Sequence, residues 1–236
     1  MKKTFLATLT LGTLFAGSSY ASLIITQTKD FNFTPTGSAD LIFSKFDTMG
    51  GTRTLLGVTV TTSVTKVGGS LYIDNDSLTG GSGTISQTVT ISLSGRNLTD
   101  NDGNVIASQQ VSSTSTHNAT VGADDGDGLN APGVNNGFQS GGVDYDGTIF
   151  GNTTSSRTAD VGSDNLTGYR TNGVGTYTIN AAGLQGIDVN AISGVAGSFS
   201  PAGATGSVTI TYTYVPEPSA ALLGGLGLLA LLRRRR

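Results

Sequence analysis

The chain has 236 residues, no cysteine, one histidine and a formal net charge of −3. The absence of cysteine excludes a disulfide framework and thiolate metal sites, and the acidic balance argues against binding nucleic acid. Glycine occurs 35 times and Ser, Thr and Asn are also abundant, a composition that favours strands joined by turns over helices.

The amino-terminal segment is typical of a secretory signal peptide. Two lysines are followed by an apolar run, Phe5–Gly17, and small residues at Ser19 and Ala21 occupy the positions that signal peptidase recognises. We therefore predict export, with cleavage after Ala21. The body that remains has seven basic residues against fifteen aspartates, a net charge of −8. The predicted organisation is a signal peptide over 1–21, one surface domain over 22–214 and a sorting segment over 215–236.

Three segments of the body alternate with a period of two: Val58–Thr65, Ile85–Leu93 and Val208–Tyr214. Aliphatic or aromatic residues alternate there with Ser or Thr, which predicts strands with one buried and one solvated face. We expect an all-β fold, an antiparallel β-sandwich of jelly-roll-like type. Ala181–Ile192 is predicted to hold one short helix or turn. Weaker strand candidates are Leu23–Thr28, Leu41–Phe46, Ser70–Ile73, Val105–Val111, Thr148–Phe150, Thr176–Ile179 and Gly197–Phe199.

The start of the body contains two further sequence features. Leu41–Asp47 ends in a Phe-Asp step, and in Leu55–Val60 a glycine, Gly57, precedes a β-type run. This opening is similar to that of the choice-of-anchor E domains, although the insertion Thr48–Thr54 departs from the tighter spacing of that family. The resemblance implies a surface domain and supplies no catalytic residues.

Residue types that commonly perform catalysis are scarce. His117 is the only histidine, it lies in a polar stretch, and no serine occupies a G-x-S-x-G elbow. Ordinary zinc ligands are lacking, and nothing distinguishes two of the aspartates as an acid–base pair. We therefore predict that the protein is not an enzyme and that His117 is an exposed loop residue, with a surface hydrolase as an alternative.

Acidic loops are the candidate metal sites. Asp124, Asp125 and Asp127 form the densest of these, and Asp144–Gly147 is similar. Carboxylates and neighbouring carbonyl groups suit calcium, although no glutamate completes an EF-hand pattern. The alternative interpretation is that these sequences form hairpin turns. The sequence requires no cofactor, and Ca²⁺ is the one that it could accommodate.

Two kinds of surface could recognise a ligand. Tyr145 and Tyr169, expected in loops, are candidates for stacking on sugars, although the chain has no tryptophan. The threonine row Thr209, Thr211 and Thr213 could form a flat ice-binding face, but such rows more often form the solvent face of a sheet. Carbohydrate binding, aided by calcium, is an alternative to a purely adhesive role, and ice binding is another.

The carboxyl-terminal segment has three zones. The motif Val215, Pro216, Glu217 and Pro218 contains the only glutamate of the chain, and its prolines predict an extended segment outside helix and sheet. The apolar run Ala220–Leu232 is predicted to form a short transmembrane sorting helix, although it is shorter than the roughly 20 residues that usually span a membrane. A basic end follows, which favours the cytoplasmic side of the membrane. It consists of Arg233, Arg234, Arg235 and Arg236.

Together these zones resemble the PEP-CTERM sorting signal of Gram-negative bacteria, with the alternative of an ordinary membrane anchor. The resemblance implies an exported protein that an exosortase processes at the inner membrane and that reaches the cell surface or the medium. Its expected partners are signal peptidase, the exosortase, the membrane through the carboxyl-terminal segment, and exopolysaccharide. The expected role is adhesion or the architecture of a biofilm matrix.

Overall fold

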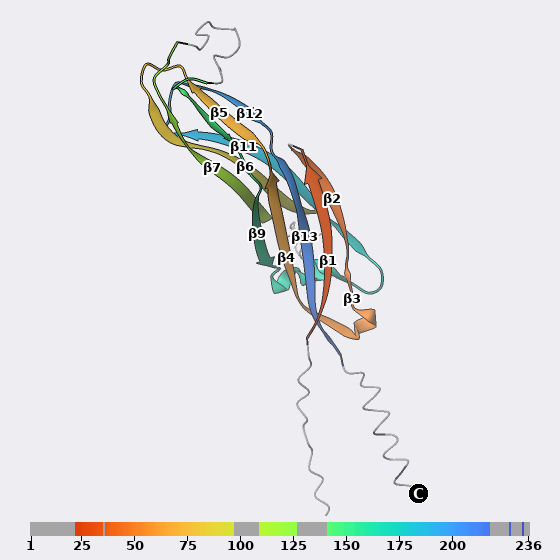
Figure 1. Cartoon of the computed structure of the whole chain (residues 1–236). Helices are drawn as coiled ribbons and strands as arrows, with labels where there is room; N and C mark the ends of the chain where they lie inside the picture. Colours follow the sequence, from red (N-terminus) through yellow and green to blue (C-terminus); the bar gives the residue numbers. More distant parts are fainter. Residues whose placement is uncertain are drawn as a thin grey trace, which may run out of the picture.

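The alternating segments of the body form long antiparallel strands, which the computed structural model arranges as two facing layers (Figure 1). Residues 22–34, 36–96, 109–126 and 141–217 are described, together with the single residues 227 and 233. The structure is mostly β, with 71% of the described residues in strands, and this confirms the prediction of an all-β sandwich.

Each layer contains one four-stranded sheet, called sheet A in the first layer and sheet B in the second. The layer of sheet A also contains a three-stranded sheet, sheet D. Sheet A has the order β1 (Leu23–Phe33), β13 (Gly203–Pro216), β4 (Arg53–Val67) and β9 (Thr153–Asp160). Sheet B has the order β2 (Gly37–Ser44), β11 (Thr176–Asn190), β6 (Gly81–Arg96) and β7 (Gln109–Val121). Sheet D has the order β12 (Val195–Ser200), β5 (Ser70–Asn75) and β8 (Tyr145–Ile149).

The remaining elements are short and are mostly found near the ends of sheet A. They are β3 (Phe46–Asp47), which pairs in parallel with β10 (Arg170–Thr171), the 3-10 turns η1 (Met49–Gly51) and η3 (Ser163–Asn165), and the helix α1 (Leu166–Tyr169). We call the end of the sandwich at Leu23 and Pro216 the base, and the end formed by sheet D the distal end (Figure 1).

Sheet D continues sheet A beyond a sharp break. β4, β9 and β13 are each joined to a strand of sheet D by two or three residues, and the strand order is the same on both sides. Gly68 and Gly69 form the break in the middle strand with φ values of 61° and 91°, which glycine adopts without strain. Gln87 of sheet B donates to the Ser200 carbonyl at 2.9 Å, so a side chain from the facing layer binds a backbone group at the break.

The break divides the hydrophobic core into two clusters. The larger cluster lies between sheets A and B and includes Val208, Ile210 and Tyr212, while Thr209 and Thr211 alternate with them on the outer face. The smaller cluster lies at the distal end and includes Leu71, Ile73 and Phe150. The three strongest period-two predictions are thus confirmed, since alternate residues of β4, β6 and β13 are buried.

Buried tyrosines join the two layers of the larger core. The Tyr212 hydroxyl of sheet A donates to the Ser44 carbonyl of sheet B at 2.8 Å and lies 2.8 Å from the Tyr177 hydroxyl. Burial raises the pKa of Tyr212 to about 12, although the hydrogen bond with Tyr177 opposes this rise. Both phenols therefore stay neutral and connect the layers by directional bonds.

Two expectations need correction. Ala181–Ile192 is not a short helix or turn, because strand β11 extends to Asn190 and pairs with β6 along this length. The strand β9 was not predicted, since all its residues except Ala159 are polar and it lies at an edge of sheet A. Among the described residues, no helix has the length and apolar character of a membrane span, and most of the predicted span Ala220–Leu232 lies outside them.

Candidate functional site at the carboxyl-terminal junction

The predicted sorting motif begins inside the sandwich. Val215 and Pro216 continue β13 and pair with Thr54 and Arg53 of β4. The expectation that Pro216 lies outside the sheet is therefore wrong. Proline is tolerated there because it is the final residue of the strand, beyond the last β1–β13 pair at Leu23, so no partner needs its missing N–H.

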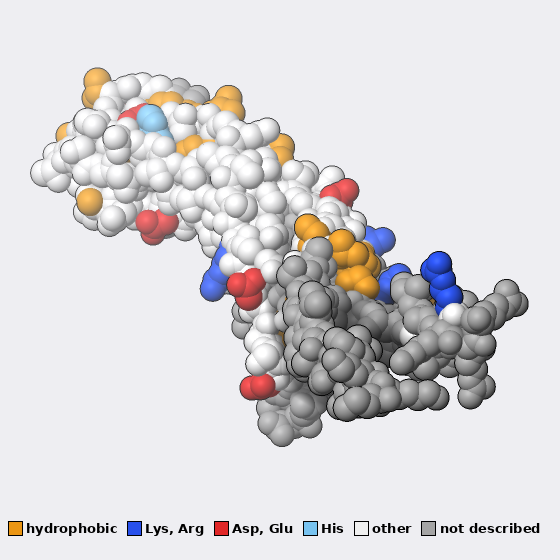
Figure 2. Space-filling view, turned by 90° about the horizontal axis from the view of Figure 1, so that it is seen from below, with side chains coloured by type: hydrophobic (Ala, Val, Ile, Leu, Met, Phe, Trp, Pro, Cys, Tyr) orange, Lys and Arg blue, Asp and Glu red, His pale blue; other side chains and the backbone are white. Residues whose placement is uncertain are grey.

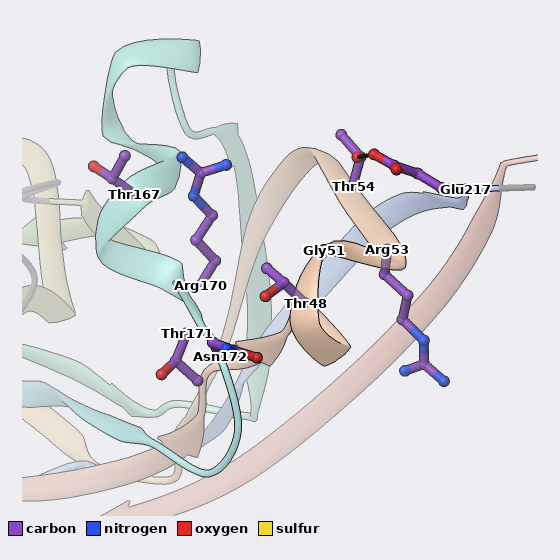
Figure 3. A pocket seen from close by; sticks show the side chains of 9 residues that line it. All are labelled: Thr48, Gly51, Arg53, Thr54, Thr167, Arg170, Thr171, Asn172 and Glu217. Carbon is purple, nitrogen blue, oxygen red and sulfur yellow. Dashed lines mark hydrogen bonds between the residues drawn. The ribbon is translucent and has the colours of Figure 1, made fainter. Parts of the chain in front are cut away.

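Glu217 is attached to the base by two hydrogen bonds. Its backbone N–H donates to the Thr52 carbonyl at 2.8 Å, and its Oε1 accepts the Thr54 hydroxyl at 2.8 Å (Figure 3). Thr54 lies 163 positions before Glu217 in the sequence, so no local sequence signal could have identified this contact. The only glutamate of the chain is thus held by the domain although the residue is exposed.

An open pocket of about 450 Å³ lies beside this attachment (Figure 3). It is lined by Thr48, Gly51, Arg53, Thr54, Thr167, Arg170, Thr171, Asn172 and Glu217. The side chains of Arg53 and Arg170 extend toward opposite sides in Figure 3, and Arg53 lies over the Tyr214 ring at 5.6 Å. Because the guanidinium groups do not converge, the pocket is not arranged as a bidentate anion site.

Asp47 fastens the loops that surround this pocket. Its Oδ1 accepts the N–H groups of Gly173 and Met49, each at 2.8 Å, and Asn172 Oδ1 accepts the Gly50 N–H at 2.8 Å. These bonds, first that from Gly173 and then that from Met49, hold the pKa of Asp47 below its ordinary value. The loops around the pocket are therefore held together by hydrogen bonds between side chains and backbone.

The other predicted motif residues are only partly described. Ala21, Pro218 and Arg234–Arg236 lie outside the described residues, as does Asp127 of the predicted metal loop, and Arg233 is an isolated described position. Asp124 and Asp125 lie in the loop that follows β7 at the distal end. Within the described ranges, no group of three or more His, Asp or Glu side chains is arranged as a metal site.

His117 is not an exposed loop residue as predicted, because it belongs to strand β7. Its Nε2 lies 3.1 Å from Asp146 Oδ1, and Asp146 Oδ2 accepts the Thr120 N–H at 2.7 Å. Partial burial would raise the pKa of Asp146, but the hydrogen bonds from Thr120, His117 and Gly147 outweigh this effect and lower it. Seen from below, the single histidine has an acidic neighbour on a surface with few charges (Figure 2).

The two tyrosines predicted to contact sugars have different environments. Tyr169 is buried in the larger core and packs edge-on against Tyr177, so the prediction that it stacks on a sugar from a loop is wrong. Tyr145 lies in β8 rather than in a loop, and its ring stacks on Tyr72 with centroids 5.8 Å apart. Tyr145 is half-buried, so part of this pair remains accessible.

The fold defines a protein of the all-β sandwich class, and the comparisons with known proteins add little to this assignment. No known family and no curated protein matches the chain. Weak structural likenesses occur to the T13 IBDV viral particle (14% identity, 90% of this chain, 40% of that chain, TM-score 0.16) and to the infectious bursal disease virus Gx strain (13%, 84%, 44%, 0.14). The chain thus spans less than half the length of either, and these scores support no inference.

Proposed function

We propose that this is an exported, non-catalytic surface or matrix protein, which an exosortase processes at its PEP-CTERM segment and which acts in adhesion or biofilm architecture. In this proposal the signal peptide directs export, and the carboxyl-terminal segment holds the base at the inner membrane until processing. The processed protein is then at the cell surface or extracellular. The distal end, which lies opposite Leu23 and Pro216, would meet the partner.

The observation that supports this role best is the pairing of the first and last strands. Leu23 pairs with Tyr214, so the chain enters and leaves the sandwich at the same end. β13 lies between β1 and β4 and leads directly to Glu217. A pull on the tail acts along this strand and loads ladder hydrogen bonds on both sides together, because these bonds are perpendicular to it. This arrangement suits a domain held by its carboxyl-terminal end.

We also infer that the sandwich has jelly-roll topology. Four antiparallel pairs are nested in sequence, with β1–β13 outermost, then β2–β11 and β4–β9, and β6–β7 innermost. Folding such a nested hairpin over itself yields the two four-stranded sheets A and B. The topology matters for function because it places Leu23 and Pro216 at the base and leaves the β4–β6, β7–β9 and β11–β13 connections free to form the distal end.

A structural role for His117 and Asp146 supports the non-catalytic part of the proposal. Asp146 accepts bonds from β7 at both oxygens, which joins this edge strand to β8. Ser115, the nearest serine on the same face of β7, has its hydroxyl 3.3 Å from Thr153 Oγ1. Hydrolysis of any member of a polysaccharide panel by the purified protein, lost in His117→Ala, would overturn this assignment.

The test of processing is the intact mass of the mature protein from a host with and without its exosortase. We expect loss of residues 1–21 and of Arg233–Arg236 in the first host, and retention of Arg233–Arg236 in the second. Glu217→Gln should block processing. The matched variant Thr54→Val removes the bond to Glu217 but leaves the motif intact, so it should still be processed. A mature product that retains Arg233–Arg236 in the exosortase-positive host would show that the segment is an ordinary anchor.

Carbohydrate binding is the second candidate function, favoured by the stacked pair Tyr72 and Tyr145 at the distal end. Half-buried aromatic rings can pack against the apolar faces of sugars. Glycan-array binding by the full chain, reduced at least tenfold in Tyr145→Ala, would support this function. Binding of no glycan, or equal binding by the variant, would leave the adhesive role alone.

A further inference from the structure

The distal end contains a buried carboxylate with an unpartnered oxygen. Asp144 lies just before β8 and has 1% of its surface exposed. Its Oδ2 accepts the Asp125 N–H at 3.0 Å, but its Oδ1 is buried without a hydrogen-bond partner. A buried carboxylate oxygen in this state is costly unless a proton or a cation compensates it.

A second carboxylate borders the same space. A methyl group on Gly142 would collide with Asp125 Oδ2 and would lie 2.8 Å from Asp144 Oδ1. Both oxygens therefore face the position that a Cβ would occupy on this residue. Gly142 also has a φ of 86°, a conformation that glycine adopts readily. Two carboxylates that face one space repel each other, and a cation between them removes the repulsion.

The backbone around these oxygens is held by bonds between loops. Asp144 accepts the Asn75 N–H through its carbonyl at 3.1 Å, and Val143 accepts the Gly122 N–H at 2.7 Å. The Asn75 side chain donates to the carbonyls of Thr79 and Gly122. The position of Asp144 is therefore fixed by neighbouring segments, as a preformed binding site requires.

We propose that Asp144 and Asp125 bind a divalent cation of the calcium type at the distal end. Two carboxylates supply up to four of the six to eight oxygens that Ca²⁺ takes, and water would supply the rest. Such a partial shell places the affinity in the range of extracellular modules, a dissociation constant of about 0.1–1 mM. Magnesium fits less well because it requires a near-ideal octahedron and keeps its water. This site differs from the predicted Asp124–Asp127 loop in its main ligand, Asp144.

The test is thermal unfolding of the purified full chain in detergent, with EGTA, with 10 mM CaCl₂ and with 10 mM MgCl₂. By mass action on the folded state we expect CaCl₂ to raise the midpoint by roughly 3–10 °C, and MgCl₂ to raise it by less. Asp144→Asn keeps an oxygen for the Asp125 N–H and removes the charge. It should abolish the calcium effect while remaining at least as stable as the wild type in EGTA.

Asp188→Asn is the matched control, since it removes an equally negative but exposed side chain. It should keep the full calcium effect. Asp125→Asn, at an exposed position, gives a second test if Asp144→Asn fails to fold, and it should reduce the calcium effect at least threefold. An unchanged midpoint of the wild type in CaCl₂, or an equal shift in Asp144→Asn, would refute the site whether or not the tail is processed.

Discussion

Lys66 occupies a core position of β4 just before the break between sheets A and D, and its side chain is fully buried. Its Nζ donates to the Gly68 carbonyl at 2.5 Å and lies 5.1 Å from the centre of the Phe150 ring. No ion pair to Lys66 forms within the described ranges. A buried ammonium with one carbonyl and one ring as partners is incompletely compensated for the loss of water.

We predict that Lys66→Met stabilises the protein. Desolvation of the ammonium costs several kcal/mol, against about 1.5–3 kcal/mol from a charged hydrogen bond and about 2 kcal/mol from a desolvated cation–π contact. Methionine keeps most of the buried length but leaves the Gly68 carbonyl without this donor, at a cost of about 1 kcal/mol. The expected net gain is about 1–2 kcal/mol, or roughly 2–8 °C in the unfolding midpoint of a domain of this size.

The stability difference between Lys66→Met and the wild type should depend on pH. Burial lowers the pKa of Lys66 below its ordinary value of 10.5. Between the folded and unfolded pKa values the unfolded chain binds more protons, so the stability of the wild type rises with pH in that window. The advantage of Lys66→Met should thus be largest at neutral pH and should shrink as the pH approaches 10.5.

Urea unfolding of both proteins between pH 7 and 10.5 measures this difference. Lys29→Met, at an exposed position of β1, is the control and should change stability by less than about 0.5 kcal/mol. Destabilisation of Lys66→Met at pH 7 would refute an uncompensated burial of the ammonium. A stability difference from the wild type that does not change with pH would refute it as well.

Three further predictions concern the layers and the edges. Tyr212→Phe should lower the free energy of unfolding by about 1–3 kcal/mol in urea titrations, because the Tyr177 hydroxyl loses its partner; an unchanged value would contradict the bond between layers. Asp146→Asn should lose less stability than the wild type as the pH falls below the ordinary aspartate pKa of 3.8, because a carboxyl with a lowered pKa stabilises only while ionised; parallel acid titrations would argue against the bonds that Asp146 accepts from Thr120 and His117. Gly206→Ala should destabilise by more than about 2 kcal/mol, since its methyl would collide with backbone of the neighbouring strand; wild-type stability would refute the close approach.

The layers themselves could be predicted from local pattern. Val208–Tyr214 and Ile85–Leu93 alternate in hydrophobicity, and a strand exposes alternate residues to opposite faces, so the core sides of β13 and β6 follow from the order of residues alone. Only such strongly alternating segments are predictable in this way. β9 lacks an apolar face, since all its residues except Ala159 are polar, and it becomes a strand because β4 offers it an open edge, which no local property of its sequence encodes.

The functional contacts required the tertiary structure for the same reason. The composition and order of residues by themselves indicated an all-β body, and they singled out Glu217 and the acidic loops. Only folding brings Thr54 to Glu217, buries Lys66 and places Asp144 against Asp125. Hydrophobic alternation is a local property of the chain, whereas the pairing of buried polar groups depends on contacts between segments that are far apart in sequence.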